Sequence, residues 1–100
     1  MNAMLKQAQK MQEDMENLQA ELDEREYDVS AGGGVVTVKI SGKKEILAID
    51  IKPEIIDPDD PETLSDILVA AVNEAIKRVE DTNSAEMQKV TGQMNLPGLF

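Results

Sequence analysis

Cysteine, histidine and tryptophan are absent from this sequence of 100 residues. Without cysteine the chain can form neither a disulfide nor a thiolate nucleophile. Without histidine, no Ser-His-Asp or Cys-His catalytic site can be built. A zinc site would need carboxylates alone, which is uncommon. We therefore expect a protein that is not an enzyme and that binds no cofactor, no metal and no small-molecule substrate.

Aromatic residues and long apolar runs are also scarce. Tyr27 and Phe100 are the only aromatic residues, so the core must be aliphatic. No apolar run reaches the ~18 residues of a membrane-spanning helix, and the N-terminus lacks a basic-then-apolar signal segment. These absences predict an intracellular protein without a membrane partner.

Positive charge is the third scarcity, because 10 basic residues face 20 acidic ones and the formal net charge is −10. A generic polyanion binder needs an excess of Lys and Arg over Asp and Glu, and in this chain the acidic residues are in excess instead. One hundred residues predict one small domain with a thin core, which subunit pairing would help to stabilise.

A heptad pattern dominates the first 26 residues. At this spacing one narrow stripe of an α-helix is apolar, which favours pairing with another helix over packing on a broad sheet. Packing of the stripe on the domain's own core is the alternative. The predicted dimer seam consists of Met4, Ala8, Met11, Met15, Leu18 and Leu22.

Three short alternating runs follow over residues 27–52 and predict half-buried β-strands. The middle run places Val36, Val38 and Ile40 on one face. Residues 41–43, Ser-Gly-Lys, predict a tight hairpin in which Gly42 is available for positive φ. In the last run, Leu47, Ile49 and Ile51 share a face.

Three consecutive glycines, residues 32–34, raise the question of a phosphate-binding loop. A dinucleotide fingerprint needs G-x-G-x-x-G between a strand and a helix, but these glycines lie between two predicted strands. They also lack the helix N-terminus that would bind a phosphate. We interpret them as a turn that needs positive φ.

The second helix is predicted over residues 60–90, with Asp60 as N-cap and Pro61 in its first turn. A broad apolar face predicts that it covers the sheet. The neighbouring acidic residues lack the glycine and distal glutamate of a calcium loop. Thr91-Gly92 is expected to end the helix and residues 91–100 to form a tail, which completes an α+β fold of helix, three antiparallel strands and helix.

Four segments together resemble the YbaB/EbfC family of nucleoid-associated proteins. They are AMLKQAQKMQEDMENLQAEL, SAGGGVVTVKISGKKEILAIDI, LVAAVNEAIKRVED and TGQMNLPGLF, which span nearly the whole chain. The resemblance implies a bacterial protein of the cytoplasm and nucleoid. It implies a homodimer whose first helices project as arms and bind double-stranded DNA with little sequence specificity, with effects on nucleoid organisation or gene expression.

Charge selects the residues that would contact DNA. The arm is acidic from Glu13 to Glu26, where Arg25 is the only basic residue. Positive charges gather without local excess of carboxylates at Lys6, Lys10, Lys39, Lys43 and Lys44, which are the residues expected to contact DNA.

A protein–protein adaptor for DNA repair or recombination factors, which uses the methionine-rich seam, is the alternative function.

Overall fold

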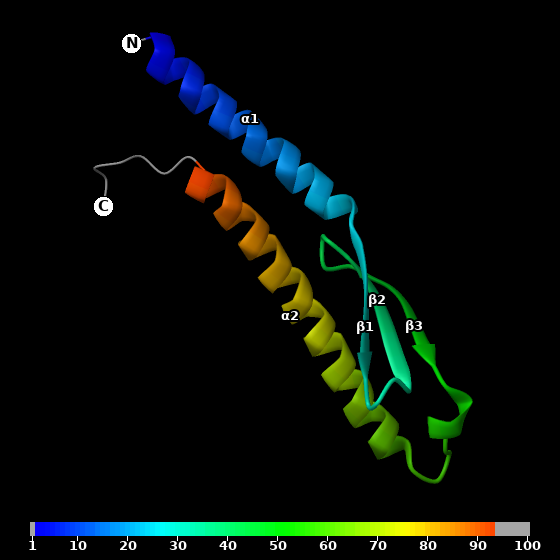
Figure 1. Ribbon diagram of the computed structural model, residues 1–100. Helices are drawn as coiled ribbons and strands as arrows, with labels where there is room; N and C mark the ends of the chain where they lie inside the picture. Colours follow the sequence, from blue (N-terminus) through cyan, green and yellow to red (C-terminus); the bar gives the residue numbers. More distant parts are fainter. Residues whose placement is uncertain (1, 94–100) are drawn as a thin grey trace.

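The predicted order of helix, three strands and helix is confirmed in the structure, a computed structural model that describes residues 2–93 (Figure 1). Residues 94–100, most of the predicted tail, lie outside the described residues. The molecule is elongated, with extents of 70 × 26 × 15 Å. Its elements are α1 (Asn2–Glu24), β1 (Glu26–Ala31), β2 (Val36–Ser41), β3 (Ile46–Ile51), the 3-10 turn η1 (Pro53–Ile55) and α2 (Pro61–Gln93).

The three strands form an antiparallel sheet in the order β1-β2-β3. Val38 in the central strand pairs with Val29 of β1 and with Ile49 of β3, so these three side chains lie on the same face. The β2–β3 register shifts between Lys39 and Ile40, which marks a local irregularity in the ladder.

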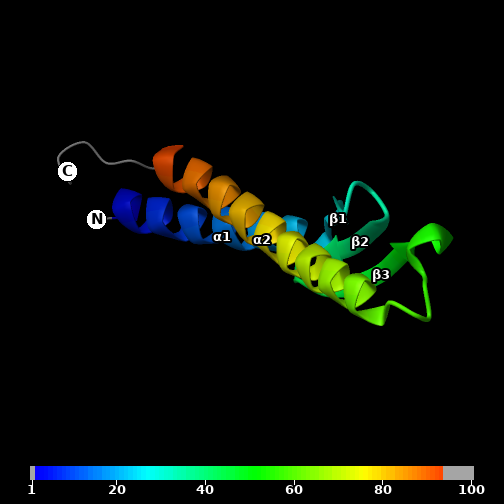
Figure 2. The same cartoon turned by 90° about the horizontal axis from the view of Figure 1, so that it is seen from below.

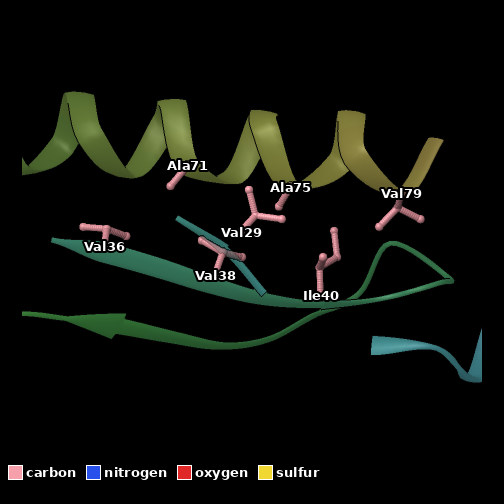
Figure 3. Close-up of a cluster of buried hydrophobic side chains, with 7 residues drawn as sticks. All are labelled: Val29, Val36, Val38, Ile40, Ala71, Ala75 and Val79. Atoms are coloured by element: carbon pink, nitrogen blue, oxygen red, sulfur yellow. The ribbon is translucent and has the colours of Figure 1, made fainter. Parts of the chain in front are cut away.

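The core lies between α2 and the β1–β2 part of the sheet (Figure 3). Small side chains on α2 let the helix approach the sheet closely, and branched side chains on the strands fill the remaining space. The alternation predicted for the middle strand is thus confirmed. The buried cluster consists of Val29, Val36, Val38 and Ile40 from the sheet and Ala71, Ala75 and Val79 from α2.

The third strand differs from the expectation of a half-buried strand. Ile46, Leu47 and Ile49 are 39%, 46% and 42% exposed, and only Ile51 of this strand packs against the core. An α-helix is about 10 Å wide and strands lie about 4.8 Å apart, so one helix covers roughly two strands. The third strand is left beside α2 instead of under it.

Both turns of the sheet use unusual backbone geometry. Gly32, Gly33 and Gly34 all have positive φ, which confirms the turn interpretation. At the β2–β3 turn the prediction was wrong, because Lys44 takes positive φ (67°) and Gly42 does not. Gly42 has a different role: a Cβ there would collide with the carbonyl oxygen of Leu22, so the glycine permits close approach of α1.

The second helix begins as predicted, with both side-chain oxygens of Asp60 used for capping. Its Oδ1 accepts a hydrogen bond from the backbone N–H of Thr63 (3.4 Å), and its Oδ2 accepts one from the Thr63 hydroxyl (2.7 Å). At the other end, Thr91-Gly92 does not stop the helix, which continues to Gln93. One glycine costs about 1 kcal/mol in a helix, which an otherwise regular helix can absorb.

Within residues 2–93, neither long helix is apolar enough to cross a membrane.

Candidate nucleic-acid interface

The first helix leaves the sheet and runs beside the C-terminal half of α2 (Figures 1 and 2). Arg25 holds the junction, since its guanidinium lies 2.9 Å from a carboxylate oxygen of Glu21 and 3.6 Å from one of Glu86 on α2. Asn83 of α2 donates a 3.2 Å hydrogen bond to the carbonyl oxygen of Gly42. The Arg25 contacts tie the base of α1 to α2, and the Asn83 bond ties the β2–β3 turn to α2.

The predicted seam changes character along α1. At the base, Leu22 is completely buried in its own protomer. Met11, Met15 and Leu18 are half-buried, and Met4 and Ala8 are exposed. We call residues 2–12 of α1 the arm tip. Every side chain from Ala3 to Lys10 is exposed.

Lysines predicted to contact DNA fall into two groups. Lys39 lies 3.6 Å from a carboxylate oxygen of Glu26, and Lys44 lies 3.3 Å from one of Glu80, so both are partly neutralised. In the part of the chain that the structure describes, five cations form no ion pair. They are Lys6, Lys10, Lys43, Lys52 and Arg78.

Two of these free cations, Lys52 and Arg78, were not among the residues selected from the sequence. Lys52 follows β3 as an isolated cation, so no cluster drew attention to it. Arg78 adjoins Lys77, which pairs with Asp81 at 3.2 Å. The hydrogen bond from Lys77 to Asp81 raises the pKa of the lysine, and the bond from Arg25 to Glu21 raises the pKa of the arginine. Both paired groups therefore stay charged but have an anion beside them.

Charge is segregated along the long axis of the molecule. The arm tip contains Lys6 and Lys10 and no Asp or Glu, and residues 87–93 of α2 contain Lys89 and no Asp or Glu. Both segments lie at the same end of the molecule in two views (Figures 1 and 2). The acidic residues all lie between positions 13 and 86, towards the sheet. Lys6 and Lys10 thus stand at one end of an otherwise acidic protein, and the first carboxylates, those of Glu13 and Asp14, follow one helical turn after Lys10.

Comparisons with known proteins identify relatives of this chain. A nucleoid-associated protein of Alkaliphilus metalliredigens is 61% identical over 100 residues, which cover 100% of this chain and 88% of that protein. A nucleoid-associated protein of Clostridium novyi is 54% identical over 99 residues, which cover 99% of this chain and 87% of that protein. A crystal structure of an uncharacterized protein from Helicobacter pylori has the same fold, with a TM-score of 0.73, 20% identity and coverage of 88% of this chain and 92% of that one.

The family model with the description "YbaB/EbfC DNA-binding family" matches residues 1–94, nearly the whole chain. A DNA-binding family agrees with the prediction of a protein that is not an enzyme. On the sequence match over both helices and all three strands, this chain belongs to the YbaB/EbfC DNA-binding family.

Proposed function

We propose that this protein is a homodimer that binds double-stranded DNA through its arm tips, with little sequence preference, and so acts on the bacterial nucleoid. The observation that carries the proposal is the unpaired Lys6 and Lys10 on an exposed helical segment without carboxylates. The names of the relatives from Alkaliphilus and Clostridium support the nucleoid as its location.

The chemistry of the arm tip favours contact with phosphates. Lysine binds a phosphate as a point charge, whereas specific reading of a base edge often uses the bidentate geometry of arginine. Phosphate contacts position a protein on the duplex but carry no sequence information. Lys43 on the β2–β3 turn is a further unpaired cation that we assign to the DNA surface, with Lys39 and Lys44 in weaker, ion-paired roles.

The exposed apolar surface beside α2 supports the homodimer. We call it the β3 patch and define it as Ile46, Leu47, Ile49, Ile56 and Val69, which are between 39% and 58% exposed. Monomers rarely leave such a cluster in water. In a two-fold dimer the same patch on both copies would be covered at once, and each copy would supply the apolar cover that the protomer's own α2 cannot provide.

The heptad seam on α1 is the alternative surface for the dimer. Two of its half-buried members, Met11 and Met15, line a groove with Met87 of α2 in the same chain. Its exposed members, Met4 and Ala8, lie on the arm tip. Dimerisation through the β3 patch would leave both arms free to project. Dimerisation through the seam would join the arms to one another.

Sedimentation of paired variants separates the two surfaces. We expect Leu47→Glu with Ile49→Glu to give a folded monomer, because two carboxylates would lie in the contact. Met4→Glu with Ala8→Glu is the matched control and should remain dimeric. The reverse pattern would assign the dimer to the seam, and a monomeric parent protein would contradict the homodimer altogether.

Fluorescence anisotropy on labelled duplexes tests DNA binding. We expect the parent protein to bind two unrelated sequences with similar affinity at low salt. Raising the salt should weaken both equally, because counterion release from phosphates dominates. If the parent binds neither duplex at low salt, the DNA proposal fails and the adaptor function becomes the better account.

A further inference from the structure

The arm is joined to the body through a single residue. Helix α1 ends at Glu24 and strand β1 begins at Glu26, so only Arg25 lies between them. Its backbone is held on both sides. The N–H of Arg25 donates a 3.2 Å hydrogen bond to the carbonyl oxygen of Leu22, and its carbonyl oxygen accepts a 2.8 Å bond from the N–H of Gly42. Any change in the direction of the arm therefore has its pivot at this joint.

The side chain of Arg25 links the two long helices. Its guanidinium lies 2.9 Å from Glu21 of α1 and 3.6 Å from Glu86 of α2. The longer distance exceeds that of a hydrogen bond, so the contact with Glu86 is mainly an attraction between charges. Within the described residues 2–93, no other ion pair connects α1 or the joint to α2. This one contact therefore carries the charge attraction between the arm and α2.

Each charge of this contact has a second partner on its own side of the joint. Glu21 lies on α1 beside Arg25, and Lys89 of α2 lies 3.7 Å from the same Glu86 oxygen that Arg25 contacts. If the arm moves away from α2, Arg25 keeps Glu21 and Glu86 keeps Lys89. Breaking a partly buried ion pair is costly when it leaves a charge without a counter-charge. Here neither charge is left alone, so the contact can open and close at small cost.

Small rotations at the joint produce large movements at the arm tip. Lys6 precedes Arg25 by 19 residues, which places it about 28 Å along the helix axis at ~1.5 Å per residue. A rotation of about 10° at the joint then moves Lys6 by about 5 Å. The position of the arm tip is thus sensitive to a contact that lies far from it.

We propose that Arg25 and Glu86 form an ionic latch that sets the angle between the arm and α2. In the closed state their attraction holds α1 beside α2. In the open state, which is reached when salt screens that attraction, Glu21 and Lys89 take over the two charges and the arm swings away from α2 about the joint. The latch lies within one chain and needs neither DNA nor a second copy, so its failure and that of the proposed function are distinguishable.

Pulsed electron–electron double resonance between two spin labels tests the latch. The chain has no cysteine, so Gln7→Cys on α1 and Gln88→Cys on α2 place both labels at exposed positions. Labelled chains are diluted with unlabelled ones, so that only distances within one chain are measured. We expect Glu86→Gln to lengthen the distance between the labels by about 5 Å, the movement for a rotation of about 10°. In about 1 M salt, where the Debye length is about 3 Å, the parent should approach the distance of the variant.

Two matched variants separate the latch from a general effect of charge. Asp81→Asn also removes one carboxylate from α2, but it breaks only the pair with Lys77 of the same helix, so the distance should stay that of the parent. Lys89→Gln removes the residue that takes over Glu86 in the open state. The latch should then stay closed to a higher salt concentration than in the parent.

Three results would overturn the latch. One is an equal distance in the parent and in Glu86→Gln, which would mean that apolar contacts between α1 and α2 hold the arm. Another is an equal shift in Asp81→Asn, which would mean that net charge and not this pair moves it. The third is an unchanged distance in the parent up to about 1 M salt. That titration needs no substitution in the latch, so it decides the matter even if Glu86→Gln does not fold.

Discussion

The sheet-and-helix body and the arm use apolar residues in opposite ways. In the body, Val36, Val38 and Ile40 are completely buried under α2, and a single glycine lets α1 approach the sheet. In the arm tip, Met4 and Leu5 are 77% and 63% exposed, and lysines stand without ion pairs. The body therefore determines stability, and the arm is free to carry the contacts with other molecules.

Truncation of a core side chain should lower the free energy of unfolding more than any of the changes that follow. Ile40→Ala removes a completely buried side chain between β2 and α2, which should lower the free energy of unfolding by about 2–5 kcal/mol. Met4→Ala in the arm tip is the control and should change it by less than about 0.5 kcal/mol. Urea denaturation measures both. Similar losses in the two variants would mean that the arm is part of the core.

A substitution at the joint between body and arm should have the second-largest effect on the free energy of unfolding. Gly42→Ala would press a Cβ into the carbonyl oxygen of Leu22, so α1 must shift, at a cost of about 3 kcal/mol. Gly34→Ala, where a Cβ meets open space, should cost about 1–2 kcal/mol from positive φ alone. If Gly42→Ala proves the milder change in thermal unfolding, the close approach of α1 is not needed for stability.

A valine in the β1–β2 turn should have a smaller effect than the core change. Gly33 has φ of 74° and open space around it, so Gly33→Val should lose about 1–3 kcal/mol through backbone strain. Added ATP or NAD should raise the melting temperature of neither protein. A ligand-dependent rise in the parent would show that the glycine run binds a nucleotide.

The smallest effect is expected from a surface ion pair of the body. Lys44→Gln breaks the contact with Glu80 and should change the free energy of unfolding by less than about 1 kcal/mol, because both groups are close to half exposed. The loss should shrink further at high salt. A change as large as that of Ile40→Ala would show that the turn is held by this pair.

Periodicity in the sequence predicted which residues of β2 are buried, but not whether β3 is covered. A two-residue repeat assigns Ile49 to the face that carries Val38, yet the width of α2 decides that this face stays open. The role of Gly42 was missed for a similar reason. Its neighbour is the carbonyl oxygen of Leu22, twenty residues away in sequence, and local turn preferences do not report such an approach.

Clusters of lysine were visible in the sequence, whereas their ion pairs were not. Glu80 lies on a different element from Lys44, so the pairing emerges only when α2 lies against the sheet. The arm tip could be predicted because its lack of acidic residues is a property of consecutive positions. Local charge thus identified Lys6 and Lys10 correctly as free cations. It overestimated the number of free cations around the hairpin, where Lys39 and Lys44 are ion-paired.

The most direct test of the division between body and arm is the salt dependence of DNA affinity in two matched double variants. Lys6→Gln with Lys10→Gln removes two unpaired charges per chain, four in the proposed dimer, and Lys39→Gln with Lys44→Gln removes the same number of paired ones. We expect the arm variant to bind duplex DNA at least tenfold more weakly, with a slope of log affinity against log salt reduced by up to about 3–4. The sheet variant should lose far less, and both should unfold like the parent. Equal affinity and equal slope for the arm variant and the parent would contradict the account.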